Sequence, residues 1–203
     1  MTSEMARRLT ELGYEIFRKM ERRVEEPLGL ELSRLGVDLP EDYASFLAEF
    51  PETGMFDRQV GFRGRNPTPW EGRDGVASLE TLYGRCDIDT LDIISIRSSY
   101  LEEFGPRLLV IGQVTGANEV CMSCDGEDKG RIYVWDHEHY GDPADAFYPA
   151  FDHFSDLING LFEYEAPPNN SQYRKYESAG IMETQEHYGI IMLIRSMFGQ
   201  NKK

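Results

Sequence analysis

The chain has 203 residues, a formal net charge of −15, 40% hydrophobic residues and 12% aromatic residues. This length and composition are typical of one globular domain with an extension, and they exclude an intrinsically disordered chain. The excess of acids argues against nucleic-acid binding, because phosphate groups must be neutralised by Lys and Arg.

The negative charge is concentrated in the middle of the chain. The stretch Asp74–Pro168 carries 19 acids and 5 bases, whereas the two flanking stretches are close to neutral. Such a region is typical of an ordinary solvated surface, and it would equally attract a basic protein partner.

The cellular compartment can also be predicted. The first 26 residues are charged throughout and lack the apolar core of a signal peptide. No apolar run reaches the roughly 20 residues that a membrane span needs. Three cysteines, Cys86, Cys121 and Cys124, are too few for a disulfide framework. We therefore expect a cytoplasmic protein that makes no contact with a membrane.

The N-terminal part of the chain predicts several helices. Apolar residues recur every three or four positions through Glu4–Glu26, which indicates an amphipathic helix with a solvated charged face. Leu30–Gly36 predicts a helical turn or coil, and Leu39–Phe50 predicts a helix that stops at Pro51. Ser78–Gly84 has a Ser cap and a Gly stop, so it predicts a further short helix.

Two more segments precede the central strands. The alternation of Phe56, Val60 and Phe62 with polar residues makes a pair of strands plausible within Met55–Trp70. The stretch Ser98–Phe104 is helical in pattern and ends at Gly105-Pro106.

Three strands joined by turns are predicted next: Arg107–Gly112, Glu119–Ser123 and Arg131–Trp135. In the third, Ile132 and Val134 share one face, while Tyr133 and Trp135 share the other. An antiparallel meander of this kind needs apolar cover on at least one face, which the helices would supply.

The C-terminal part predicts two helices separated by a linker. An apolar stripe from Phe154 to Phe162 indicates the first, and Pro167–Ser171 has the composition of a linker. Glu183–Phe198 predicts an apolar helix that packs on this domain or on a second copy of the chain, as a homodimer. The predicted organisation is an N-terminal helix (1–29), a central domain (30–168) and a helical extension (169–203).

The pairs Cys121/Cys124 and His137/His139 are candidate zinc ligands. The two histidines are only one residue apart, whereas zinc sites usually space them by three to five. We therefore expect no metal and no cofactor, and a Cys/His metal-dependent hydrolase remains the less favoured alternative. Acid–base catalysis by Asp136, His137 and Glu138 is also less favoured, because the sequence has no nucleophile elbow and no phosphate loop. The chain is accordingly predicted not to be an enzyme.

Four segments together resemble a known family. LPEDYASFLAEF (Leu39–Phe50), LLVIG (Leu108–Gly112), GRIYVWDHE (Gly130–Glu138) and FDHFSDLINGLF (Phe151–Phe162) follow the order seen in the SUKH superfamily, closest to its Smi/Knr type. The resemblance covers about residues 30–165. The chain departs from the pattern where Pro51–Gly54 replaces a double glycine and where Asp57–Gly75 is longer than usual.

The resemblance implies an α+β fold with a central, mostly antiparallel sheet flanked by helices. It also implies a non-enzymatic immunity protein that binds and neutralises a cognate bacterial toxin, such as a basic nuclease, in the cytoplasm. A Smi/Knr-like regulatory scaffold is the alternative. Contacts in this family lie on the sheet and its adjoining loops, which here implies a partner-binding set of Asp125, Glu127, Asp128, Trp135, Asp136 and Glu138.

Overall fold

The described residues all belong to one compact unit, residues 1–165. The structure is a computed structural model, and it describes residues 3–17, 20, 26–65, 68 and 75–165. The predicted helix Glu183–Phe198 and its homodimer contact therefore lie outside the described residues.

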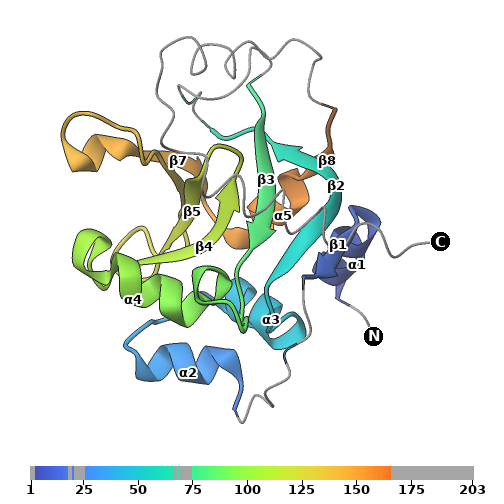
Figure 1. Cartoon of the computed structure of the whole chain (residues 1–203), viewed down its shortest axis with the longest axis horizontal. Coiled ribbons are helices and arrows are strands. Elements are labelled where there is room, and N and C mark those ends of the chain that lie inside the picture. The colour runs from blue at the N-terminus through green and yellow to red at the C-terminus, as the bar shows by residue number, and fades with distance from the viewer. Residues whose placement is uncertain (1–2, 18–19, 21–25, 66–67, 69–74, 166–203) are drawn as a thin grey trace. The chain divides into compact units, whose positions relative to one another are not determined.

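The described part is built on one antiparallel sheet of eight strands, which confirms the predicted α+β class (Figure 1). Strands β1 to β7 are neighbours in sequence order, and β8 pairs with β2 on the same edge as β1 but at the other end of β2. The strands are β1 (Tyr14–Ile16), β2 (Gly54–Phe62), β3 (Ala77–Leu82), β4 (Leu108–Val114), β5 (Asn118–Ser123), β6 (Ile132–Trp135), β7 (Phe147–Phe151) and β8 (Phe162–Glu163).

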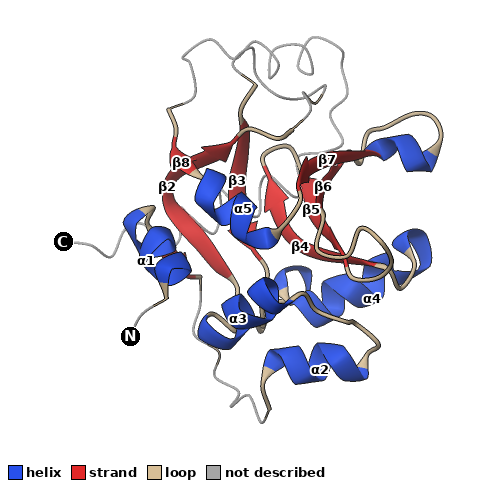
Figure 2. Cartoon of the chain, turned by 180° about the vertical axis from the view of Figure 1, so that it is seen from behind, coloured by secondary structure: helices blue, strands red, loops and turns tan. Residues whose placement is uncertain are grey.

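Helices cover this sheet. They are α1 (Glu4–Glu11), α2 (Leu28–Arg34), α3 (Glu41–Glu49), α4 (Ile93–Phe104) and α5 (Phe154–Gly160), with short 3₁₀ turns η1 (Asp89–Leu91) and η2 (Pro143–Ala146). Figure 2 shows α1, α3 and α5 on the near side of the sheet. Their core is aromatic: the ring of Phe154 lies 4.8 Å from Tyr43 and 4.9 Å from Phe46.

Helix α4 begins and ends at residues suited to those positions. Asp92 caps its first turn by accepting hydrogen bonds from the backbone N–H groups of Ile94 and Ser95. Gly105 ends it with a φ of +68°, a conformation that glycine adopts without strain.

The predicted helix Glu4–Glu26 is wrong at Leu12–Phe17, which are not helical. Helix α1 ends at Glu11, and Gly13 then turns the chain with a φ of +77° into strand β1. Tyr14 faces the core from this strand, where its ring lies 5.3 Å from Phe56, whereas Ile16 of the predicted apolar stripe is exposed. Leu30–Gly36, predicted as a helical turn or coil, lies largely in helix α2, which spans Leu28–Arg34.

The predicted helix at Ser78–Gly84 is also wrong, because Ala77–Leu82 forms strand β3 between β2 and β4. Pairing on both sides satisfies its backbone and overrides the local Ser and Gly signals. Similarly, where a strand pair was expected within Met55–Trp70, the described residues of that range contain one long strand, β2, with an irregular register between Met55 and Val60.

The sheet curves enough to bring β2 towards β7, although four strands separate them in the pairing order. The rings of Phe62 and Phe151 lie 5.6 Å apart, and the backbone N–H of Arg65 donates to the carbonyl of Ala150 at 3.1 Å. In the described part of the chain, no helix is both long and apolar enough to cross a membrane.

The predicted meander is confirmed by β4, β5 and β6, and so are the two faces of β6. Ile132 and Val134 are buried, whereas Tyr133 and Trp135 are half-buried on the opposite face. That second face is the one that helix α4 approaches, since the rings of Trp135 and Phe104 lie 4.9 Å apart.

Candidate functional site

The predicted partner-binding residues lie at two opposite ends of the β5–β6 hairpin. Asp125, Glu127 and Asp128 belong to the loop that joins β5 to β6. Trp135, Asp136 and Glu138 lie at the far end of β6 and in the loop that follows it. Because a strand rises about 3.3 Å per residue, about 10 Å of β6 separates the two groups. The structure therefore does not bring the six residues into one patch.

At the first end, Asp128 is bonded within the fold. Its carboxylate pairs with the Arg107 guanidinium and accepts hydrogen bonds from Tyr133 Oη at 2.8 Å and Ser123 Oγ at 3.2 Å. Burial acts to raise the pKa of Asp128, but the hydrogen bonds from Tyr133 and Arg107 outweigh it and lower that pKa below its ordinary value. Asp125 and Glu127, by contrast, are exposed.

At the second end, Trp135 belongs to a continuous aromatic strip formed by Tyr100, Phe104, Tyr133, Trp135 and Phe147. Trp135 lies 5.7 Å from Tyr100 and 4.9 Å from Phe104 between ring centroids. Phe104 in turn lies 5.3 Å from Phe147, which lies 6.5 Å from Tyr133. All five side chains are half-buried, so the strip packs on the fold and still presents apolar surface to solvent.

Beside the strip, the β6–β7 loop (residues 136–146) carries four acids and an exposed tyrosine. The loop is closed at its base by a hydrogen bond from the backbone N–H of Asp136 to the carbonyl of Ala146 at 3.0 Å. Tyr140 is 98% exposed, and the loop extends beyond the end of the sheet (orange, left of Figure 1). The acids are Asp136, Glu138, Asp142 and Asp145.

This loop is tied to the sheet through His137. Asn118 Oδ1 lies 2.8 Å from Nδ1 of the His137 ring and accepts from the His137 backbone N–H at 3.2 Å. Asp136 Oδ1 accepts from the Glu138 backbone N–H at 3.0 Å. These bonds hold the start of the β6–β7 loop against β5. Sequence reasoning missed Tyr140, because no periodic pattern distinguishes an exposed loop tyrosine from a packed one.

Sequence reasoning also missed Glu119, which is buried beneath the strip. Its carboxylate lies 3.3 Å from Tyr100 Oη and 3.4 Å from Tyr83 Oη, and only 6% of the residue is exposed. Burial raises the pKa of Glu119 to about 8, although hydrogen bonds from Tyr100, Tyr83 and Gln113 act to lower it. The sequence did contain a signal for this buried acid, because Glu119 is the one charged residue in the strand Asn118–Ser123.

The cysteines proposed as alternative metal ligands lie in the interior. Cys121 and Cys124 are 0% and 2% exposed, and burial raises the pKa of both thiols, that of Cys124 to about 12. No three His, Cys, Asp or Glu side chains among the described residues are grouped closely enough to hold a metal ion.

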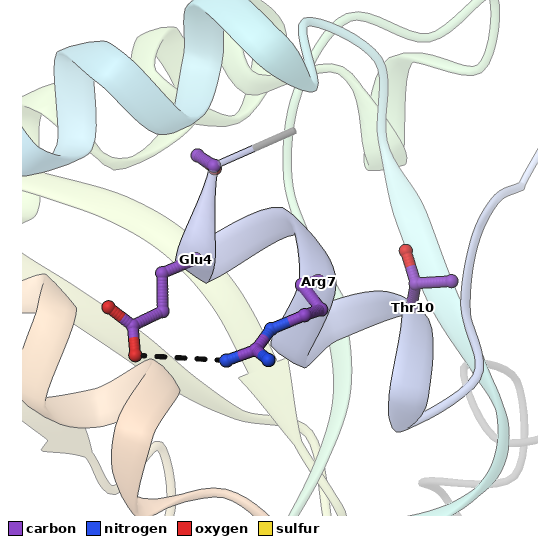
Figure 3. Close-up of a pocket in the computed structure, with 4 residues that line it drawn as sticks. Glu4, Arg7 and Thr10 are labelled. Carbon is purple, nitrogen blue, oxygen red and sulfur yellow. Dashed lines mark ion pairs between the residues drawn. The ribbon is translucent and has the colours of Figure 1, made fainter. Parts of the chain in front are cut away.

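A surface hollow on helix α1 is lined by Ser3, Glu4, Arg7 and Thr10 (Figure 3). Arg7 and Glu4 form an exposed ion pair at 3.9 Å, and such pairs contribute little to stability or binding. Ser3 and Thr10 bond to the backbone of the same helix through Ala6. The hollow is therefore explained by helix capping and surface charge, and we assign it no binding role.

Comparison with known proteins agrees with the resemblance seen in the sequence. The profile of the SMI1/KNR4 family (SUKH-1) matches residues 32–160. The SPbeta prophage-derived uncharacterized protein YokK of Bacillus subtilis (strain 168) is 27% identical over 138 residues, which cover 64% of this chain and 69% of YokK. The matched region includes strands β2 to β7 and both loops described above, so the chain belongs to the SMI1/KNR4 family (SUKH-1).

Proposed function

We propose that the protein is a non-enzymatic immunity protein, which binds a cognate bacterial toxin in the cytoplasm and neutralises it. Membership of a family that includes immunity proteins supports this proposal. The observation that carries it is the adjacency of the aromatic strip and the acidic β6–β7 loop, which form a surface suited to a basic protein.

The strip supplies the apolar part of such an interface. Trp, Tyr and Phe are enriched where binding energy is concentrated, and Trp135 is already held in place by Tyr100 and Phe104. A side chain that is fixed before binding loses little conformational entropy when the partner arrives.

The acids supply attraction and orientation. Glu138, Asp142 and Asp145 are exposed, and none of the hydrogen bonds or ion pairs described for them includes Lys or Arg. Their charge therefore remains available to a cationic partner, within the roughly 8 Å over which charges act at physiological ionic strength. A nuclease is the kind of toxin that this charge suits, because nucleases carry basic surfaces for phosphate.

The residues at the other end of the hairpin divide into two kinds. Asp125 and Glu127 are exposed and can extend the attractive field, whereas Asp128 is neutralised by Arg107. We therefore place the contact itself at the Trp135 end.

Co-expression tests the proposed function. The chain is expressed in a bacterial host together with each toxin-like protein encoded beside its gene. The proposal predicts that one of these proteins arrests growth alone, that the chain restores growth, and that the two purify as a complex. Absence of any complex and of any rescue across all such neighbours would overturn it.

A further inference from the structure

A titratable carboxyl group lies directly under the aromatic strip. Glu119 of β5 is the register partner of Trp135 of β6, and paired residues of antiparallel strands project from the same face. Glu119 is buried, whereas Trp135 keeps part of its surface exposed. Any change in the charge of Glu119 therefore acts on the underside of the proposed binding surface.

The hydrogen-bond partners of Glu119 come from three different elements. Tyr100 Oη, from helix α4, lies 3.3 Å from Oε1, and Tyr83 Oη, from the residue that follows β3, lies 3.4 Å from Oε2. The Gln113 side chain, from the paired position on β4, also bonds to Glu119. Hydrogen bonds to Glu119 therefore link helix α4, the end of β3 and strand β4 beneath Trp135.

The groups around this carboxyl cannot neutralise its negative charge. The titratable groups that face Glu119 or its tyrosines are Glu80 in β3, Tyr83 directly after β3, Tyr100 and Glu103 on α4, and Cys121 on β5. His137 faces Trp135, with ring centroids 6.4 Å apart. No hydrogen bond or ion pair in the described part of the chain joins Glu119 to a Lys or Arg. Burial without a cation favours the protonated carboxyl.

From this arrangement we propose that Glu119 is a positioning residue for Trp135, and that loss of its proton rearranges the aromatic strip. The protonated form keeps α4 docked and Trp135 fixed. When Glu119 ionises, a charge without a cation lies in the interior, and α4 must shift or admit water to solvate it. Its effect on partner binding rests on the proposed function, but the rearrangement itself is a property of this chain alone.

The rearrangement would reach Trp135 through α4. Tyr100, which bonds to Glu119, stacks on Phe104 at 4.7 Å with an interplanar angle of 12°. Both rings contact Trp135, and Phe104 also contacts Phe147 of β7. A displacement of Tyr100 therefore moves the strip as a unit.

The emission of Trp135 against pH tests this inference without a partner. The sequence contains two tryptophans, so the measurement uses Trp70→Phe as the background in which Trp135 alone reports. We expect a single transition with a midpoint at about pH 8. In the same background, Glu119→Gln keeps the shape of the side chain but cannot ionise, so the transition should vanish. A matched variant at an exposed acid of α4, Glu102→Gln, should keep it.

Two further variants make the assignment specific. Tyr83→Phe removes one hydrogen bond to the carboxylate without touching Trp135, so it should move the midpoint to higher pH, which a merely structural role would not do. If Glu119→Gln fails to fold, the shift of the emission midpoint in Tyr83→Phe still tests whether Glu119 is the group that titrates. His137→Gln should leave the midpoint unchanged. A transition that persists in Glu119→Gln, or no transition between about pH 6 and about pH 10, would overturn the inference.

The test separates this inference from the proposed function. If the emission transition is found but no toxin partner is, the inference stands and the proposed function fails. If the toxin binds with equal affinity in wild type and Glu119→Gln from neutral to alkaline pH and Trp135 shows no transition, the proposed function stands and the inference fails.

Discussion

Glu119 and Trp135 occupy directly opposed positions on β5 and β6, yet one is buried beneath helix α4 and the other reaches the surface. The pair links a buried carboxyl, hydrogen-bonded to Tyr83 and Tyr100, to the half-exposed ring proposed to meet a partner. A buried carboxyl and a ring proposed to bind a partner are therefore neighbours through a single strand pairing.

The first prediction concerns the pH dependence of stability. Burial raises the pKa of Glu119 from its ordinary value of 4.5 to about 8, so the folded state holds a proton that the unfolded state releases. Its contribution to the free energy of unfolding is therefore full below pH 4.5, falls as pH rises, and is lost above about pH 8. Urea unfolding of wild type and Glu119→Gln over this range should diverge as pH rises. If the free energies of unfolding of wild type and Glu119→Gln changed equally with pH, the prediction would be contradicted.

The second prediction separates Asp128 from its neighbour Asp125. Asp128→Asn weakens the bonds to Arg107, Ser123 and Tyr133 and should lower the free energy of unfolding by about 1–2 kcal/mol at neutral pH. Because the folded-state pKa of Asp128 is lowered, this difference should shrink as pH falls through that pKa. Asp125→Asn, at an exposed position, should change stability by less than about 0.5 kcal/mol. Equal effects of the two changes would show that Asp128 has no special structural role.

The third prediction identifies which end of the hairpin meets the partner. Glu138→Lys with Asp142→Lys should slow association with the toxin strongly at low salt, because exposed charges act mainly on the association rate. Reversal of Asp125 and Glu127 should slow it less. Association rates measured against salt concentration check this. A larger loss from the Asp125/Glu127 reversal would move the contact to the opposite end.

The fourth prediction tests the path of β3 beside β4. A Cβ on Gly112 would lie 2.5 Å from the backbone carbonyl oxygen of Thr81, so Gly112→Ala should cost about 1–3 kcal/mol of stability. Gly29→Ala, in helix α2, places its Cβ at an ordinary 3.7 Å from Leu39 and should be neutral or stabilise by up to about 1 kcal/mol. Thermal unfolding distinguishes the two, and an unaffected Gly112→Ala variant would contradict the observed strand pairing.

Local patterns predicted most of the central elements of this fold. The alternation in Ile132–Trp135 correctly assigned the faces of β6, and Pro51 and Gly105 marked the ends of two helices. The prediction failed at β3, where a Ser and a Gly suggested a helix while pairing with β2 and β4 decided the structure. It failed again at Gly13, where a turn ends helix α1 and leads into β1, although the apolar pattern predicted that the helix continues.

The candidate site was less predictable, because burial and pairing of charges depend on distant residues. Asp128 and Asp125 are three residues apart, but of these two only Asp128 forms an ion pair with Arg107, the residue before β4. Glu119 is buried by Tyr83 and Tyr100, which lie 36 and 19 residues away in the chain. No spacing rule connects these positions, so the sequence could indicate an acidic surface but not which acids remain available.

The most direct test of the central claim is rescue of growth by a variant altered only at the proposed contact. Tyr140 is 98% exposed, so Tyr140→Ala combined with Glu138→Lys should leave thermal stability unchanged within about 0.5 kcal/mol. Co-expressed with the neighbouring toxin, wild type should restore growth and this double variant should not. Equal rescue by wild type and the double variant would contradict binding through the Trp135 end of the sheet.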